Sequence, residues 1–220
     1  MKSFLPLMAA ALLAGCGNNP SVPDWQMNAQ SAVERSTNAY LTGNTRVEQA
    51  DYQRAREALA STGKVDLVLR AELIRCATRV ASLVFEPCAG FDQLAQDASA
   101  SERAYAAYLA GNASAADAPL LPEQHRATAA AVAAGSDAAA AAVQAIADPL
   151  SKLVASGVLL RAGKATPQTL ADAVEAASAQ GWRRPLLAWL GAQAMRAQQA
   201  GDTAEAQRIE RRMALVSGKP

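Results

Sequence analysis

Residues 65–84 read Val-Asp-Leu-Val-Leu-Arg-Ala-Glu-Leu-Ile-Arg-Cys-Ala-Thr-Arg-Val-Ala-Ser-Leu-Val, and this stretch decides the fold. Its apolar side chains recur at positions i, i+4, i+7, i+11 and i+14, which are Leu69, Leu73, Cys76, Val80 and Leu83. This spacing places them on one face of an α-helix. The pattern therefore predicts a buried helix over 65–84 that is central to its half of the protein.

The same stretch carries a narrow strip of charged residues, Glu72, Arg75 and Arg79. Helical spacing alone leaves three interpretations open: the strip faces solvent, the arginines pair with Glu72, or they face a partner.

The composition favours helix throughout the chain. Alanine accounts for roughly a quarter of the residues, and it has the highest helix propensity of all residue types. Aromatic residues make up only 5% of the chain, and β-branched residues are sparse. We expect an all-α protein built from antiparallel helix hairpins, because the predicted connections are short.

Short signals typical of helix starts recur along the chain. Asp24 is the expected cap of a first helix, and capping-box patterns occur at Thr45-Arg46-Val47-Glu48 and Ser99-Ala100-Ser101-Glu102. Further starts are expected at Pro122, Ser136, Asp148-Pro149, Thr166-Pro167, Trp182-Arg183-Arg184-Pro185 and Gly201-Asp202. Together they predict one helical domain over 24–220, in which the loose segment 111–122 is the best candidate for an internal boundary.

The N-terminus has the pattern of a cleavable signal peptide over 1–15. Lys2 supplies a positive charge, residues 4–13 are apolar, and Ala14-Gly15 are small enough to precede a cleavage site. Ten apolar residues rise only about 15 Å as a helix, about half of a bilayer core, so a permanent membrane span is disfavoured.

The motif Leu13-Ala14-Gly15-Cys16 resembles the lipobox of bacterial lipoproteins. The resemblance implies that Cys16 carries acyl chains such as palmitate, and that 16–23 forms a lipidated cysteine and tether. The family retains proteins at the inner membrane through an aspartate after the cysteine. Gly17 stands here, which implies the outer membrane, facing the periplasm, with surface exposure left open. The alternative is an ordinary secretory signal that ends at a cysteine by chance.

Cys76 and Cys88 are the two remaining cysteines. In an oxidising periplasm such a pair commonly forms a disulfide, which would join the predicted helix to the loop that Pro87 and Gly90 introduce. The alternative is a small core side chain at Cys76 and a free loop thiol at Cys88.

Two six-residue segments, 39–44 (Ala-Tyr-Leu-Thr-Gly-Asn) and 107–112 (Ala-Tyr-Leu-Ala-Gly-Asn), are nearly identical. Their separation is twice the 34-residue period of tetratricopeptide repeats, and the C-terminal pieces Leu190-Gly191, Gly201-Asp202 and Glu205-Ala206 resemble parts of such a repeat. The body is therefore either a tetratricopeptide-like superhelix or an irregular helical bundle.

The sequence offers little reactive chemistry. Its only histidine, His125, lies in the polar first turn of a predicted helix and is expected at the surface or in a cap. Because a single histidine cannot form a multi-histidine zinc site, we expect no metal site, and we expect no cofactor. The Glu-Ser dipeptide of lytic transglycosylases does not occur. Loss of Lys2 leaves 20 basic and 20 acidic residues, a balance that disfavours a nucleic-acid partner.

These observations predict a non-enzymatic adaptor or scaffold that is held to the membrane by its N-terminal acyl chains and binds other envelope proteins. The expected partner contacts are Trp182, Arg183, Arg184 and Trp189, because Trp and Arg dominate binding hot spots. Their alternative role is ordinary core packing beside a solvated helix start. Alternative functions are a carrier for a lipid or small apolar ligand and, less favoured, a cell-wall-associated enzyme.

Overall fold

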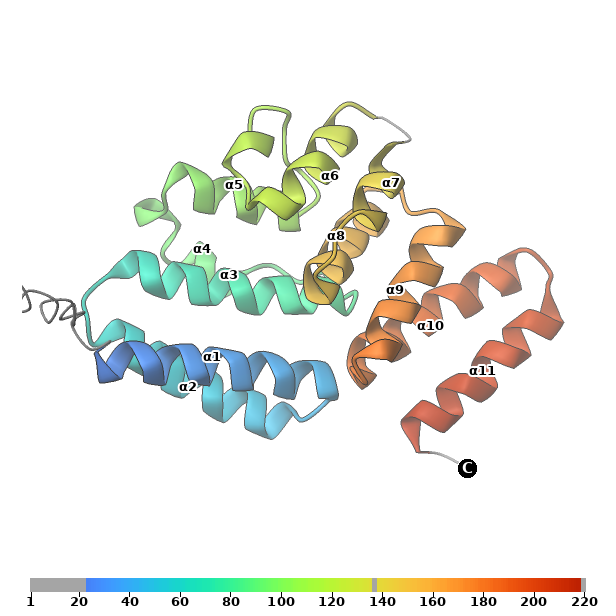
Figure 1. The fold of residues 1–220 in the computed structure, drawn as a ribbon, viewed down its shortest axis with the longest axis horizontal. Coiled ribbons are helices and arrows are strands. Elements are labelled where there is room, and N and C mark those ends of the chain that lie inside the picture. The colour runs from blue at the N-terminus through green and yellow to red at the C-terminus, as the bar shows by residue number, and fades with distance from the viewer. Residues whose placement is uncertain (1–22, 136–137, 219–220) are drawn as a thin grey trace, which may run out of the picture.

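The computed structural model describes residues 23–135 and 138–218, and all regular secondary structure in this part of the chain is helical (Figure 1). Eleven α-helices and two short 3₁₀-helices occur in this part of the chain, which confirms the all-α prediction. The predicted lipobox at Leu13-Ala14-Gly15-Cys16 and the predicted cap at Ser136 lie outside the described residues.

The first half of the chain forms three long helices followed by shorter ones. Its elements are α1 (Asp24–Thr42), α2 (Thr45–Ala60), α3 (Val65–Ala81), α4 (Ala89–Asp92), η1 (Ala95–Asp97) and α5 (Ala100–Leu109). The second half continues with η2 (Ala118–Leu120), α6 (Glu123–Ala133), α7 (Ala138–Gln144), α8 (Pro149–Arg161), α9 (Pro167–Ala179), α10 (Arg183–Gln199) and α11 (Thr203–Ser217).

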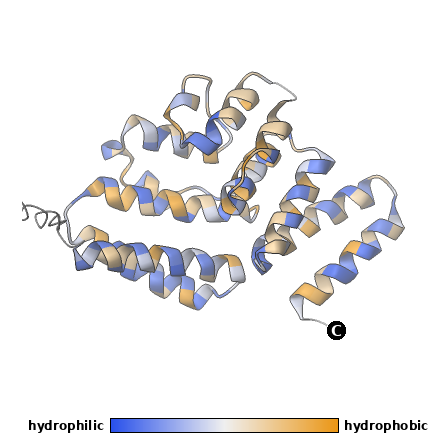
Figure 2. Ribbon diagram, viewed as in Figure 1, coloured by the Kyte–Doolittle hydropathy of each residue, from blue (hydrophilic) through white to orange (hydrophobic). Residues whose placement is uncertain are grey.

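Helix α3 is the central element of the first half. It packs against α1 and α2 on one side, α4 and α5 on another, and α8 from the second half (Figure 1). Leu69, Leu73 and Val80 of the predicted stripe are buried, and Cys76 and Leu83 are partly buried against the same apolar core. Most helices mix hydrophobic and hydrophilic residues, as Figure 2 shows, because one stripe of each faces the core. Helix α8 differs, since all its residues from Leu153 to Leu159 are buried.

Helix α3 ends three residues earlier than predicted, at Ala81. Leu83 adopts φ 59°, the left-handed conformation of a helix terminus, and the amide of Val84 donates to the carbonyl of Arg79 at 3.0 Å. A non-glycine residue in this conformation gives no sequence signal, which explains the error.

The two near-identical segments adopt the same local structure. Each ends a helix, with Gly43 at φ 91° and Gly111 at φ 76°. The amide of Asn44 donates to the carbonyl of Ala39, and the amide of Asn112 to that of Ala107. This is the Schellman arrangement, in which glycine accommodates the positive φ at no steric cost. Each copy thus encodes a helix end.

Most of the predicted caps are present. Ser99 and Glu102 form the reciprocal capping box, and Asp148, Thr166 and Asp202 each accept a backbone N–H of their own helix. Two predictions were wrong. Asp24 lies inside α1 and Pro23 precedes it, whereas Asn44, in place of Thr45, accepts the amide of Val47 at 3.2 Å.

The apolar core runs continuously through both halves. Its buried members extend from Leu69 to Ile209 and include Ala118 and Leu121, within the segment 111–122. Helices α8, α9, α10 and α11 then pack in chain order, each on the one before.

The crossing of α3 and α8 depends on a glycine. A Cβ atom at Gly157 would lie 2.4 Å from the carbonyl oxygen of Val80 and 2.9 Å from its Cγ1. Helix α8 therefore approaches the backbone of α3 more closely than any side chain permits.

We expect Gly157→Ala to lower the free energy of unfolding by about 1 to 3 kcal/mol, because the added methyl group must push α8 away from a backbone carbonyl. Gly191→Ala is the matched control, since a Cβ there meets only Met213 Cε, at 3.9 Å. That substitution should stabilise the protein by up to about 1 kcal/mol through helix propensity. Urea unfolding followed by circular dichroism compares the two, and equal effects would contradict the close crossing.

Candidate interaction surface

A surface depression with a mainly apolar lining, which we call the trough, lies between α1 and α3. It has a volume of about 620 Å³ and is lined by Trp25, Gln26, Ala29, Gln30, Val33, Glu34, Leu59, Lys64, Leu67, Arg70, Ala71 and Ile74. Its floor is made of small buried side chains, Ala29 at 3% exposure and Ala71 at 4%. The trough is therefore deep because alanines stand where larger side chains would fill it.

A second groove of about 430 Å³ adjoins the trough on the other side of α3. The two share Arg70 and Ile74, and the second continues over α5 to Leu120, Leu121 and Pro122. Ile74 and Leu120 are 39% and 43% exposed, so large apolar side chains face water at the junction and at the far end. We call the two depressions together the α1–α3–α5 groove.

Arg70, on the rim shared by the two depressions, is held by acids on both sides. Its guanidinium lies 3.3 Å from Glu102 of α5 and 3.8 Å from Asp66. Burial alone would raise the pKa of Glu102, but hydrogen bonds from Ser99 and from Arg70 outweigh it and lower that pKa below its ordinary value. Glu102 therefore stays ionised and fixes the position of Arg70.

Glu48 anchors the opposite side of α3. It is 2% exposed and lies 3.1 Å from Arg75 and 3.6 Å from Arg79. The two guanidinium groups also lie over the rings of Tyr52 and Tyr40. The arginines of the predicted charged strip thus face neither solvent nor Glu72, and Glu48 is not the capping-box residue that the sequence predicted.

Two further buried acids join helices of the first half. Asp51 of α2 accepts hydrogen bonds from Arg35 of α1 and from Arg54, and the Arg35 bond is the main cause of a lowered Asp51 pKa. Glu72 of α3 pairs with Arg56 of α2 at 3.2 Å. A buried acid that loses its arginine leaves an uncompensated charge, so these pairs fix how α1, α2 and α3 sit together.

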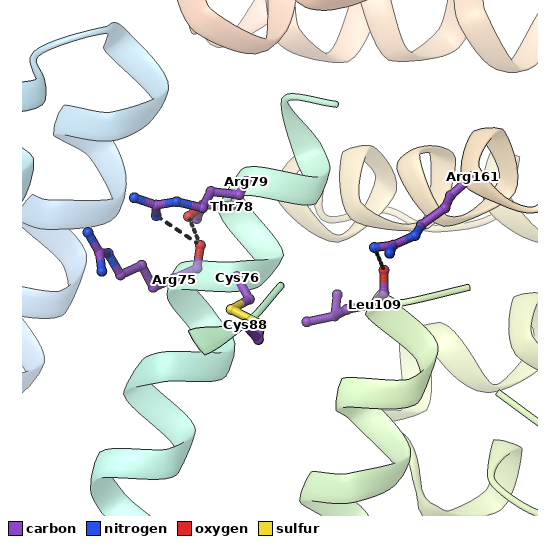
Figure 3. Close-up of a disulfide and its surroundings, with 7 residues drawn as sticks. All are labelled: Arg75, Cys76, Thr78, Arg79, Cys88, Leu109 and Arg161. Atoms are coloured by element: carbon purple, nitrogen blue, oxygen red, sulfur yellow. Dashed lines mark hydrogen bonds between the residues drawn. A yellow bond between two sulfur atoms is a disulfide. The ribbon is translucent and has the colours of Figure 1, made fainter. Parts of the chain in front are cut away.

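The predicted disulfide is present. Cys76 and Cys88 are joined with their Cα atoms 5.9 Å apart, linking α3 to the loop before α4 (Figure 3). Because α3 ends at Ala81, the loop has a shorter distance to cover back to Cys76 than it would after a helix that continued to Val84.

The expected partner contacts lie at a joint between the two halves of the chain. Trp189 is fully buried, and its indole N–H donates to the carbonyl of Ala81, at the end of α3, at 3.0 Å. Arg184 donates to the carbonyl of Tyr40 at 2.7 Å and to Thr45 Oγ1 at 2.9 Å, and it stacks on the Tyr40 ring. Both side chains thus have partners within the chain.

The other two expected contacts lie beside this joint. Trp182 is partly buried against the main apolar core, and Arg183 is exposed with its guanidinium close to Gly43. A third donor, Arg161 of α8, bonds the carbonyl of Leu109 at 3.2 Å, at the end of α5 (Figure 3). No local sequence pattern signals these long-range bonds, because their partners lie 52 to 144 residues apart.

His125 is buried, and the expectation of a surface or capping position was wrong. It is 2% exposed, and its Nδ1 lies 3.3 Å from the hydroxyl of Tyr108. Its ring packs beside those of Tyr105 and Tyr108. Burial lowers the pKa of His125 to about 4, which a contribution from Asp148 opposes, so the ring is neutral at pH 7.

Within residues 23–135 and 138–218 no group of three or more His, Cys, Asp and Glu side chains is arranged to hold a metal ion. None of the helices in the described part of the chain has the length and apolar character that a membrane span requires. No protein family, curated protein or solved structure matches this chain.

We expect Trp189→Phe to cost about 2 to 3 kcal/mol in the free energy of unfolding, because it leaves the Ala81 carbonyl without its donor and opens a small cavity. Trp182→Phe is the matched control, since no hydrogen bond of its ring nitrogen occurs among the described residues. It should cost less than about 1 kcal/mol. Thermal and urea unfolding measure both, and equal losses would contradict a specific role of the Trp189 bond.

The lowered pKa of His125 predicts how the free energy of unfolding depends on pH. Its pKa is 6.5 when free and about 4 in the fold, so between these values the unfolded chain binds a proton that the native protein excludes. The free energy of unfolding should therefore fall as the pH is lowered through this window, by up to about 1.4 kcal/mol per pH unit.

The variant His125→Gln keeps a polar partner for Tyr108 but does not titrate, so its stability should change less between pH 6.5 and 5. Urea unfolding at several pH values tests this. The lowered pKa values of Asp51 and Glu102 affect the free energy of unfolding at lower pH. Their contribution to stability is lost as the pH falls and these carboxylates are protonated. Parallel profiles of the two proteins above pH 5 would refute the assignment.

Proposed function

We propose that this protein is a lipid-tethered helical adaptor of the bacterial cell envelope, which binds an apolar segment of another envelope protein in the α1–α3–α5 groove. The observation that carries the proposal is the groove itself, with its alanine floor and its exposed apolar residues Ile74 and Leu120. Contiguous exposed apolar surface on a protein typically marks an interaction site.

The position of the groove fits a membrane tether. It begins at Trp25, in the first turn of α1, directly after the predicted tether. The segment 17–23 spans at most about 25 Å, at about 3.6 Å per residue. If Cys16 is acylated in the outer membrane, the groove stays near that membrane and can meet only partners in its vicinity.

A carrier function is the second candidate, and the volume of the groove favours it. Its two depressions of about 620 and 430 Å³ lie within the size range of small-molecule sites, and their lining is largely apolar. Denaturing extraction of the purified, lipid-free protein followed by mass spectrometry would recover a bound ligand if this were the function.

The adaptor proposal predicts site-specific crosslinking in bacterial cells. A photoreactive residue in place of Ile74 or of Leu120 should capture the same envelope protein, because both positions line one groove. The same residue at Leu215, which is 81% exposed on α11, is the matched control and should not capture it. Identical products from all three positions, or none from the groove positions, would contradict the proposal.

The tether is tested separately. Cys16→Ser should abolish palmitate labelling and release the protein from the membrane fraction. Unchanged labelling in this variant would reject lipidation at Cys16 while leaving the binding function of the groove open to the crosslinking test.

A further inference from the structure

We propose that the Cys76–Cys88 disulfide closes a redox-controlled strap beyond the end of α3, which an external dithiol opens without unfolding the rest of the protein. The strap is the four-residue segment 85–88 (Phe-Glu-Pro-Cys), which lies between the end of α3 and the start of α4. This region shares no residue with the lining of the α1–α3–α5 groove, so the inference is independent of the adaptor function.

The strap has few attachments besides the disulfide. Backbone bonds hold the chain on either side of it. The amide of Val84 donates to the carbonyl of Arg79 at 3.0 Å, and the amide of Asp92 donates to the carbonyl of Cys88 at 2.9 Å. Residues 85–87 themselves make no hydrogen bond or ion pair with any described residue. A segment with so few bonds opens locally once its covalent link is cut.

The turn that leads into the strap also needs support from its surroundings. Leu83 adopts φ 59°, and a non-glycine residue is unfavourable in this left-handed region unless neighbouring structure holds it there. The disulfide contributes such support, because it joins the chain that follows the turn back to Cys76 on α3.

Both sulfur atoms belong to residues that a reductant can reach. Cys76 and Cys88 are each only partly buried, and they line one open depression of about 310 Å³ between α3, α5 and α8. The charged residues of its lining are two arginines and two acids, Arg79, Arg161, Glu86 and Asp92. These charges balance, so the depression does not select a charged reductant.

The opening reaction is thiol–disulfide exchange. A thiolate of the dithiol attacks one of the two sulfur atoms, which breaks the bond between Cys76 and Cys88 and forms a mixed disulfide. The second thiol of the dithiol then attacks the mixed disulfide. The dithiol leaves as its own disulfide, having given up two electrons and two protons, and both cysteines end as thiols.

Opening of the strap affects the joint between the two halves. Arg161 of α8 lies with its guanidinium 5.5 Å from the centre of the Phe85 ring, and it donates to the carbonyl of Leu109 at the end of α5 (Figure 3). When Phe85 moves away, Arg161 loses one of these two contacts. Val80 and Leu109, which are 4% and 2% exposed in the same depression, then become accessible to water. The redox state of the disulfide therefore changes how firmly α8 is held to α5.

The test uses the mature chain from residue 16 with Cys16→Ser, in which Cys76 and Cys88 are the only cysteines. The oxidised protein is treated with dithiothreitol without denaturant, desalted and digested briefly with chymotrypsin. Cleavage after Phe85, measured by mass spectrometry, should be at least about tenfold faster in the reduced protein, because proteolysis follows the population of the open strap. Cleavage after Trp182, a partly buried aromatic residue between α9 and α10, is the matched control and should not change.

A double variant and two further measurements complete the experiment. Cys76→Ser/Cys88→Ser should be cleaved after Phe85 as fast as the reduced protein, and dithiothreitol should not change its rate. Alkylation before digestion counts the free thiols, and two are expected. Circular dichroism should show the same helical signal in the oxidised and reduced proteins, because only the strap opens. If the double variant does not fold, the reduced protein alone decides the test.

Three outcomes would overturn the proposal. The disulfide could resist dithiothreitol until denaturant is added, which would mean that its sulfur atoms are not accessible. Cleavage after Phe85 could stay slow although two thiols are free, which would mean that other contacts hold the strap. Cleavage after Phe85 and after Trp182 could accelerate equally, which would mean that reduction unfolds the whole protein.

Discussion

The arrangement of the two halves depends on side chains that satisfy the carbonyl groups at helix ends. The last carbonyls of a helix have no partner within it, and they concentrate negative partial charge. Arg184, Trp189 and Arg161 donate to such carbonyls at the ends of α1, α3 and α5. All three donors lie on α8 and α10, so these bonds join the second half to the first. Hydrogen bonds depend on direction, unlike apolar contacts, and they therefore fix the orientation of the two halves.

Directional bonds matter here because the apolar side chains are small. Alanine interfaces and the contact of Gly157 with α3 allow close packing but offer few large anchors that fix one register. In the first half, buried acids supply that register. Glu48, Glu72 and Glu102 are each held by an arginine from a different helix. Such pairs add little net stability, but breaking one is costly, so alternative packings of these helices are disfavoured.

The sequence predicted what depends on local patterns and failed where distant partners decide. Helical periodicity, the Ser99 capping box and the Cys76–Cys88 pair follow from short spacings, and all are present. Glu48 fitted a capping box three residues after Thr45, but Asn44 is the cap and Glu48 pairs with Arg75 and Arg79 of α3. The polar residues next to His125 in the sequence predicted a surface position, whereas aromatic rings of α5 cover its side chain. The groove could not be predicted, because it forms only where α1 and α3 pack side by side, and no local sequence pattern indicates that contact.

The same bonds that join the halves also shape the groove. Arg184 and Trp189 hold the far ends of α1 and α3, the two helices whose beginnings form the trough, and Arg70 ties α3 to α5 where the second depression begins. The floor is therefore fixed before any ligand arrives, so binding need not order it. Arg184 and Trp189 do not line the trough, so weakening the joint would affect the trough only through the positions of α1 and α3. The joint and the trough thus lie at opposite ends of the same two helices, α1 and α3.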